Sequence, residues 1–212
     1  MTARDRLRAA GFRTIRRMLA LRRPSARENR RALRTRQESL EGLTLRDARV
    51  SDIPALAALH VATWNDTYAP LMTGPPIAVR EQQWGQAFSQ PKDWFCYVLA
   101  RTDGALVGFT KGVFRPEHEI PGELSKLFLL RDYQRLGLGR RLVGRVVQRF
   151  LGAGVPAMAA YVDPRNPSCG FFERLGGQWL IEPDGHVNFS WYVWKDLPVL
   201  ARDCTLNGRG HE

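Results

Sequence analysis

The sequence predicts an α/β fold for most of the chain, on three observations. From residue 43 onward, apolar strand-like runs alternate with segments of helical periodicity. The apolar run at 127–130 passes through Gln-x-x-Gly-x-Gly into an amphipathic helix that begins near Gly139. The residues Thr-Asp-Gly at 102–104 are typical of the turn of a hairpin between two strands. Together these patterns indicate a sheet that is covered by helices.

The elements are predicted in a regular order. A strand at 44–49 leads to a helix that is capped by Ser51 or Asp52 and has Pro54 in its first turn. A proline is tolerated there because the first turn has no internal hydrogen-bond acceptor for its nitrogen. The remaining predicted elements are, in chain order, a helix at 77–88, strands at 94–100, 105–114 and 123–130, the helix near Gly139, a strand at 157–162, a helix at 167–175, and strands at 178–181 and 188–194.

The Gln-x-x-Gly-x-Gly segment has the features of a phosphate-binding turn. The first N–H groups of a helix have no partner within it, and the macrodipole makes that end positive. Gly137 and Gly139 permit positive φ and keep side chains away from an approaching anion. The segment lacks the third glycine of a Rossmann fingerprint and the Lys-Ser/Thr of a P-loop. The local pattern also fits a tight turn before a helix, so the surrounding sequence decides.

Two motifs resemble signatures of the GCN5-related N-acetyltransferase (GNAT) superfamily. Residues 134–139 resemble its acetyl-CoA loop, and residues 166–177 are similar to its Asn followed by Phe-Tyr-Glu-x-Leu-Gly. The segment from Thr44 to Pro54 is similar to the family's opening strand and first helix. The resemblance covers residues 43–197. It implies the GNAT acyl-CoA N-acyltransferase fold, a mixed central sheet of about seven strands with four flanking helices.

The resemblance also implies an acetyl-CoA-dependent N-acetyltransferase that acts on a primary amine of a small molecule or peptide by direct attack. The pantetheine arm would lie between the fourth and fifth strands and pair with the backbone of Phe128 and Leu129. Asn166 matches the family's pantetheine-binding Asn, although residues 163–167 also fit simple turn chemistry. The residues that match the diphosphate-binding positions are Gln134, Arg135, Leu136, Gly137, Leu138, Gly139 and Arg140.

Glu123 is the candidate general base. It opens the fourth predicted strand, where related enzymes often place a carboxylate. Burial would raise the pKa of this carboxyl group toward neutrality, whereas a strand-end glutamate in solvent would have no such role.

Phe172 departs from the family pattern, because it stands where the family has the Tyr that protonates or hydrogen-bonds the CoA sulfur. Phenylalanine cannot donate a proton. Another donor would have to serve, with Ser168, Cys169 and Tyr161 as candidates, or the thiolate leaves into water. We therefore expect reduced activity, and a noncatalytic acyl-CoA-binding or sensory module is the alternative.

Trp64 and Tyr68 match positions that line the acceptor pocket in related enzymes, although their spacing of four also suits core packing. His60 lies on an apolar helical face and is interpreted as a satisfied core histidine. His186 and His211 have no partners at metal-ligand spacing, so the sequence predicts no metal.

The net charge of +11 lies almost entirely in the first 40 residues, which hold 13 arginines and three acidic residues. Three interpretations stay open: an arm for nucleic acid or the ribosome, a helix on an anionic membrane, and a solvated tail. The composition also resembles an organellar transit peptide. We divide the chain into an arginine-rich extension at 1–42, helical or disordered, a GNAT domain at 43–197, and a tail at 198–212.

Three cysteines without a Cys-x-x-Cys pair favour a reducing compartment, and no apolar stretch reaches the length of a membrane span. We expect a cytoplasmic protein. A homodimer is a further expectation. The acceptor stays open among a small amine, an amino acid or antibiotic, and a protein N-terminus.

Overall fold

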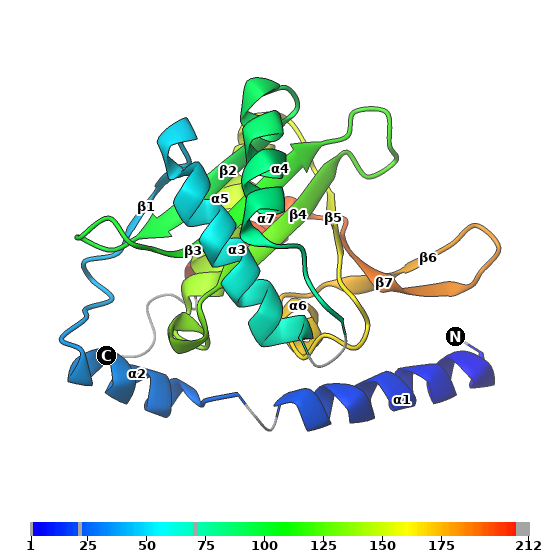
Figure 1. Ribbon diagram of the computed structural model, residues 1–212. Helices are drawn as coiled ribbons and strands as arrows, with labels where there is room; N and C mark the ends of the chain where they lie inside the picture. The colour runs from blue at the N-terminus through cyan, green and yellow to red at the C-terminus, as the bar shows by residue number, and fades with distance from the viewer. Residues whose placement is uncertain (1, 21–22, 70–71, 207–212) are drawn as a thin grey trace. The chain divides into compact units, whose positions relative to one another are not determined.

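The computed structural model describes residues 2–20, 23–69 and 72–206 (Figure 1). The chain divides into two compact units. The terminal unit comprises Met1–Arg23, Arg115–Leu124 and Val147–Glu212. The central unit comprises Pro24–Phe114 and Ser125–Val146.

The mixed seven-stranded sheet predicted from the sequence is confirmed. Its strands are β1 (Thr44–Asp47), β2 (Trp94–Ala100), β3 (Leu106–Phe114), β4 (Gly122–Leu129), β5 (Met158–Tyr161), β6 (Gln178–Ile181) and β7 (Val187–Trp194), in the spatial order β1-β2-β3-β4-β5-β7-β6. β4 and β5 pair in parallel through Gly122 with Met158 and Glu123 with Ala159. The pairs β1–β2, β2–β3, β5–β7 and β6–β7 are antiparallel.

The described residues form seven α-helices, where the sequence predicted four around the sheet. They are α1 (Ala3–Ala20), α2 (Ala26–Thr35), α3 (Ile53–Tyr68), α4 (Ile77–Ser89), α5 (Leu138–Gly152), α6 (Cys169–Arg174) and α7 (Leu197–Leu206). Short 3₁₀ turns, η1 (Val50–Asp52) and η2 (Arg131–Tyr133), precede α3 and follow β4. The four predicted helices are α3 to α6, and the additional three lie in the segments that were assigned to an extension and a tail. None of the described helices is long and apolar enough to cross a bilayer.

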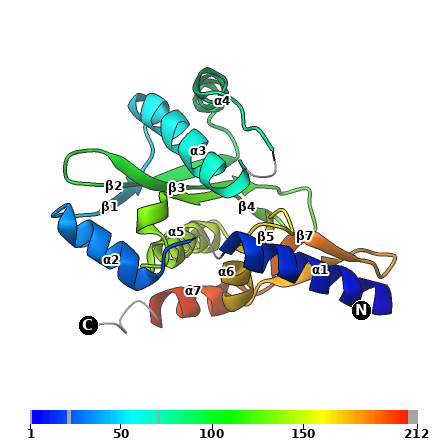
Figure 2. The same ribbon diagram turned by 60° about the horizontal axis from the view of Figure 1, so that its bottom comes forward.

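In the central unit, the alternation of side chains along the strands builds two apolar layers. Val98 and Phe109 pack on one face with Leu56 of α3 and Trp84 of α4. The intervening Leu99 packs on the other face with the start of α5. Figure 2 shows α3 and α4 on one side of these strands and α5 on the other.

α2 belongs to the second of these layers. Its N-terminus carries a capping box, in which the Ser25 hydroxyl accepts from the Glu28 amide and the Glu28 carboxylate accepts from the Ser25 amide. Leu33 is 3% exposed and clusters with Tyr133, Leu138 and other apolar side chains. The sequence of α2 is nearly all polar, and the helix is held against this layer by one buried leucine and the apolar residues around it.

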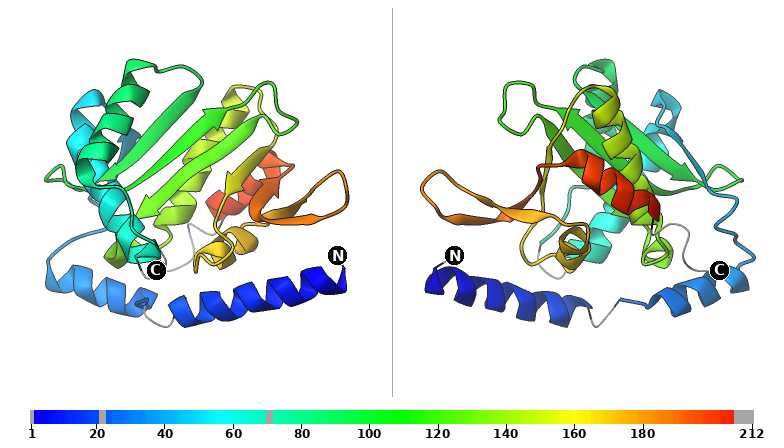
Figure 3. Two further views of the ribbon diagram at one scale, coloured as in Figure 1. Left: turned by 45° about the vertical axis from the view of Figure 1, so that its right-hand side comes forward. Right: turned by 180° about the vertical axis from the view of Figure 1, so that it is seen from behind.

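In the terminal unit, α1 lies alongside α6 and the β6–β7 hairpin (Figure 3). The Phe12 and Phe189 rings have centroids 5.7 Å apart. Arg16, only 8% exposed, donates to the Pro164 carbonyl at 2.6 Å and to the Glu173 carboxylate at 2.8 Å. These contacts fix α1 against its own unit.

α7 is a helix that the sequence analysis did not predict. Leu197 and Leu200 on it are buried, and the Leu197 amide donates to the Pro156 carbonyl at 3.0 Å. The helix runs to Leu206, and residues 207–212 of the predicted tail lie outside the described residues.

Candidate functional site

The turn before α5 has the backbone shape expected of an anion-binding segment. Two of its residues, Arg135 and Gly137, have φ of +60° and +83°. Glycine enters this left-handed region without strain, and arginine does so only where its surroundings hold it. α5 begins at Leu138, and the Arg141 amide donates to the Gly137 carbonyl at 3.1 Å. The amides of Leu138 and Gly139 lie before Arg141 in the first turn of α5. Helical N–H groups at this place have no acceptor within the helix and lie at the positive end of its dipole.

The same turn alternates between anchored and exposed residues. Leu138 is buried, and Leu136 packs against the apolar layer beneath it. Arg135 and Gly137 are exposed. Gly139 and Arg140 are half-buried in the first turn of α5. The apolar side chains thus fix the turn, while a cation and a bare backbone face solvent.

Asn29 of α2 holds this turn from below. Its side-chain amide nitrogen donates to the carbonyls of Arg131 and Gln134, at 3.0 Å and 2.9 Å. The side chain is 1% exposed, so both donors of the amide are used inside the protein. The Gln134 side chain in turn donates to the Leu129 carbonyl at 3.0 Å. Two side-chain amides therefore link α2, the turn and the end of β4.

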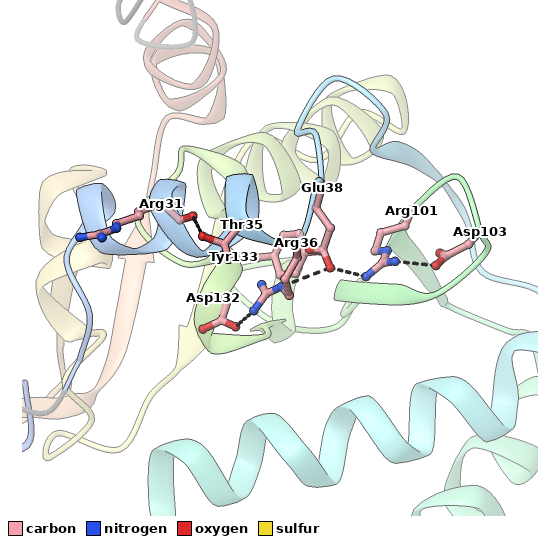
Figure 4. A network of polar contacts seen from close by, with 8 residues as sticks. All are labelled: Arg31, Thr35, Arg36, Glu38, Arg101, Asp103, Asp132 and Tyr133. Atoms are coloured by element: carbon pink, nitrogen blue, oxygen red, sulfur yellow. Dashed lines mark hydrogen bonds and ion pairs between the residues drawn. The ribbon is translucent and has the colours of Figure 1, made fainter.

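A polar network ties the segment after α2 to the same turn (Figure 4). The Glu38 carboxylate accepts from the Tyr133 hydroxyl and from Arg101, the latter at 2.6 Å. Arg36 pairs with Asp132 at 2.8 Å. Burial, and then the neighbouring Glu38 carboxylate, raise the pKa of Tyr133 to about 12. Tyr133 therefore remains a protonated donor at neutral pH and fixes η2 to residue 38.

Phe128 and Leu129, at the end of β4, point to opposite layers of the central unit. The Phe128 ring stacks on Phe109 with centroids 5.3 Å apart, whereas Leu129 packs with the layer that contains Leu138. The Leu129 carbonyl already accepts from Gln134, and the Leu130 amide donates to the Val107 carbonyl.

Trp64 and Tyr68 lie in the last two turns of α3, with ring centroids 4.6 Å apart. His60, one turn earlier, is 3% exposed, which agrees with its prediction as a core residue. Burial, followed by the charges of Arg80 and Lys126, lowers the pKa of His60 to about 3. The imidazole is therefore neutral at physiological pH. It is not satisfied as predicted, because Nδ1 has no hydrogen-bond partner among the described residues.

Glu123 lies in the terminal unit, one residue after β4 begins. Its carboxylate is half-buried and accepts from Arg115, with Nη2 at 2.8 Å and Nε at 3.0 Å. Glu123 is thus neither a solvated strand-end glutamate nor an isolated buried acid, but one partner of an ion pair.

Asn166 forms the turn that starts α6. Its side-chain oxygen accepts from the Ser168 amide at 2.8 Å, and its carbonyl accepts from the Cys169 amide at 3.1 Å. This is the turn chemistry that the sequence analysis kept as an alternative. The Cys169 thiol is fully buried and donates to the Asp163 carbonyl, and burial raises its pKa to about 11. It is therefore a protonated core thiol and not a nucleophile.

Phe172 is buried on α6 against the rings of Tyr192 and Trp194. Of the other candidate donors, the Ser168 hydroxyl accepts from Arg23 at 3.1 Å, and Tyr161 is 61% exposed beside Trp191. The terminal unit thus contains Glu123, Asn166, Phe172 and the alternative donors Tyr161, Ser168 and Cys169. The central unit contains the candidates for the diphosphate, the pantetheine backbone contacts and the acceptor at 128–129, 134–140, Trp64 and Tyr68.

In the described part of the chain, no three His, Cys, Asp or Glu side chains lie together in a group that could hold a metal ion. His186 pairs with Asp184 at 3.0 Å on the surface. His211 lies outside the described residues.

Sequence reasoning missed Asn29. The only local signal was its spacing of four from Leu33, which places both residues on one face of a helix otherwise rich in arginine.

Comparison with known proteins identifies relatives over the middle of the chain. The family model described as "Acetyltransferase (GNAT) family" matches residues 56–177. An uncharacterised N-acetyltransferase, YuaI of Bacillus subtilis, is 29% identical over 68% of this chain and 86% of its own length. A Pseudomonas paraeruginosa L-methionine sulfoximine/L-methionine sulfone acetyltransferase is 28% identical over 74% of this chain and 92% of its own.

Solved structures agree with the fold. The PaiA N-acetyltransferase of Thermoplasma acidophilum, solved in complex with coenzyme A, superimposes with a TM-score of 0.59 at 16% identity, over 71% of this chain and 97% of its own. The aminoglycoside acetyltransferase AAC(6')-Ib, also solved in complex with coenzyme A, superimposes with a TM-score of 0.56 at 18% identity, over 76% of this chain and 98% of its own. The matched family segment contains the turn before α5, whereas α1, α2 and α7 lie outside it.

Proposed function

Because the chain belongs to the GNAT acetyltransferase family, we propose that it transfers the acetyl group of acetyl-CoA to a primary amine of a small molecule or peptide. The observation that carries this proposal is the turn at 134–138. It has two residues at positive φ, is anchored by buried side chains, and opens onto the N-terminus of a 15-residue helix.

The cosubstrate's diphosphate would bind at this turn. Its oxygens would accept from the amides of Gly137, Leu138 and Gly139 and would be balanced by Arg135 and Arg140. Gln134 and Leu136 hold the turn in shape. The backbone of Phe128 and Leu129 would pair with the pantetheine arm. Asn166 stays a predicted cofactor-binding residue, on its match to the family motif.

The reaction is a direct transfer. The lone pair of the neutral amine attacks the thioester carbonyl, an N–C bond forms, and the C–S bond breaks with its electrons on the CoA sulfur. The proton lost by the amine goes to the Glu123 carboxylate, directly or through water. Because Glu123 is paired with Arg115, accepting that proton weakens the ion pair.

The leaving thiolate receives no proton from Phe172, which has none to give. A thiolate is a tolerable leaving group near neutral pH, since the reference thiol pKa is about 8.5. It takes its proton from water, and we expect slower turnover than an enzyme with a phenol at this position would show.

An amino acid or a close analogue is the acceptor class that we favour. The Pseudomonas relatives are named for L-methionine sulfoximine and L-methionine sulfone, both of which carry an α-amine. Trp64 and Tyr68 would line this acceptor.

A thiol-release assay tests the proposal. The purified chain is mixed with acetyl-CoA and a panel of amines, amino acids and peptides, and free CoA is followed over time. Release that depends on an amine, together with recovery of the N-acetyl product, is the expected result. Acetyl-CoA binding without amine-dependent release across the panel would contradict it.

The second candidate function is a noncatalytic acyl-CoA-binding module, and Phe172 is the observation that favours it. The variant Phe172→Tyr separates the two functions. Faster CoA release in the variant supports a transferase that lacks its usual proton donor. Binding without release in both proteins supports the module.

Association of the arginine-rich extension with nucleic acid or an anionic surface, homodimerisation and a cytoplasmic location stay predictions from the sequence. No described contact supports the first two.

A further inference from the structure

Buried polar atoms without partners gather on two facing helices of the central unit. Five side-chain atoms of this kind occur among the described residues, and four belong to α3 and α4. They are His60 Nδ1, Trp64 Nε1, Arg80 Nε and Trp84 Nε1. An unsatisfied buried polar group is unfavourable, so four in one place indicate a missing partner.

The four residues form one cluster. His60 and Trp64 are four positions apart on α3, as Arg80 and Trp84 are on α4, so each pair shares a helical face. The two faces meet, because the His60 and Trp84 ring centroids are 6.2 Å apart and the Arg80 guanidinium carbon is 5.4 Å from the Trp64 ring.

The cluster is rich in donors and positive in charge. Tryptophan and arginine nitrogens only donate, so three of the four atoms require an acceptor. The charged groups that act on His60 are Arg80 and Lys126, both cationic. The fourth atom belongs to a histidine that is itself neutral and 3% exposed.

Arg80 is the cationic group of this cluster that an anionic ligand would contact. It is half-buried, its Nη1 donates to the Gln83 amide oxygen at 2.9 Å, and burial lowers its pKa. Within the described ranges no carboxylate forms an ion pair with it. Buried or half-buried arginines are normally paired with an anion.

Trp64 serves as a platform for this guanidinium. The edge of its indole that carries the N–H lies against Gly74, where even a Cβ atom would come within 2.7 Å of Nε1. The Trp64 N–H therefore lies against the backbone at Gly74. Arg80 is half-buried and has, besides its buried Nε, the Nη donors of its guanidinium.

We propose that Arg80, stacked on Trp64, binds the carboxylate of the acceptor, so that the acceptor is a free α-amino acid and not a polyamine or another purely cationic amine. This inference rests on the proposed function and names the substrate class of the same site. A guanidinium suits this task because its planar fork matches a carboxylate, and the surrounding cations oppose a second amine.

The test compares amino acids with the amines they yield on decarboxylation. The probes are L-methionine with 3-(methylthio)propylamine, L-phenylalanine with 2-phenylethylamine, and L-leucine with 3-methylbutylamine. Equilibrium binding to the full chain is followed by tryptophan fluorescence, with and without CoA. At least one amino acid should bind more tightly than its amine by at least about tenfold, the value of one charged hydrogen-bonded pair.

Variants assign the preference to Arg80. Arg80→Met keeps the apolar stem but removes the donors, and it should abolish the preference while amine binding stays within about twofold. Arg80→Lys should restore part of the preference, because it returns the charge without the fork. Gln82→Ala, at an exposed position of the same helix, should leave it unchanged.

Equal binding of acid and amine in all three pairs, no binding of either, or a preference that survives in Arg80→Met would overturn the inference. The proposed function is judged separately by CoA release. Amines that are acetylated without any benefit from a carboxylate would leave the transferase standing and refute the role of Arg80. An amino acid that binds through Arg80 without CoA release would do the reverse.

Discussion

Glu123 forms an ion pair with Arg115, and this ion pair determines how its carboxylate can act as a base. Arg115 donates a hydrogen bond from Nε to its carboxylate and forms an ion pair with it through Nη2, which restrains its orientation. A positioned carboxylate accelerates proton transfer by about 10²- to 10⁴-fold when it lies within hydrogen-bond reach of the amine. The ion pair therefore orients the base but must loosen as the proton arrives.

Replacing Glu123 by Gln should lower kcat by at least about 100-fold, because the amide keeps the shape but accepts no proton. The dissociation constant of acetyl-CoA should stay within about twofold, since Glu123 makes no contact with the diphosphate turn in this account. Steady-state kinetics and calorimetry measure the two quantities. Glu119→Gln, at an exposed position before β4, is the matched control. Retention of full kcat in Glu123→Gln would remove this residue from the mechanism.

His60 should make stability depend on pH. Its pKa is about 3 in the folded chain and 6.5 as the ordinary value, so below pH 6.5 the unfolded chain binds a proton that the folded chain does not. The free energy of unfolding therefore falls as the pH drops from about 6.5 toward 3, by about 2 kcal/mol between pH 6.5 and 5.

Urea denaturation at pH 7 and pH 5 measures this effect. In His60→Phe the loss of stability between the two pH values should be smaller than in the parent chain by about 2 kcal/mol. His186→Ala, at an exposed position, should keep the parent's dependence. An unchanged dependence in His60→Phe would show that another group is responsible.

α2 is the helix that supports the turn at 134–138, through one of its side chains. Asn29 donates to two carbonyls, at Arg131 and Gln134, and so spans the 3₁₀ turn that precedes Arg135. These two hydrogen bonds restrain the backbone directly before Arg135, whose φ is positive. In the proposed function the extension therefore supports the turn that would bind the cosubstrate, although it lies outside the matched family segment.

Asn29→Ala should weaken acetyl-CoA binding by about tenfold, the loss expected for two buried hydrogen bonds that set a binding geometry. Acetyl-pantetheine, which lacks the diphosphate, should react as well with the variant as with the parent chain. Arg30→Ala, exposed on the same helix, is the control. If Asn29→Ala loses acetyl-pantetheine turnover to the same degree, the residue supports the fold in general and not the turn.

The periodic elements could be predicted because their signal is local. β2 and β6 have the bounds that the sequence predicted, and α4 differs from its prediction by a single residue. α2 and α7 could not be predicted in the same way. Their burial depends on Leu33 and Leu197 meeting partners far away in the sequence, and no local period records such a contact.

The candidate site likewise has a part that could be predicted from the sequence and a part that could not. Residues 134–140 form one contiguous motif, so their turn and helix were predictable from spacing. Arg80 and Asn29 were not, because they depend on properties of the folded chain. Arg80 Nε is buried without a hydrogen-bond partner among the described residues, and Asn29 donates to carbonyls far away in the sequence. Phe172 was recognised only because a family pattern sets an expectation for its position.

At the scale of the whole molecule, the two halves of the arginine-rich extension have different attachments. α1 is fixed within the terminal unit through Arg16, and α2 is fixed within the central unit through Leu33. The exposed arginines that remain give the chain a strong positive charge, which attracts any polyanion, including CoA, at low salt. A measurement of specific binding must therefore separate this general attraction from recognition by the turn.

Calorimetric titration of the full chain with acetyl-CoA in about 0.5 M salt makes that separation, because exposed charges are screened at this ionic strength. We expect saturable binding of one acetyl-CoA per chain, with a dissociation constant on the order of 10 μM. Heat that disappears at high salt, or no association at millimolar acetyl-CoA, would contradict the claim that the turn before α5 grips the cosubstrate.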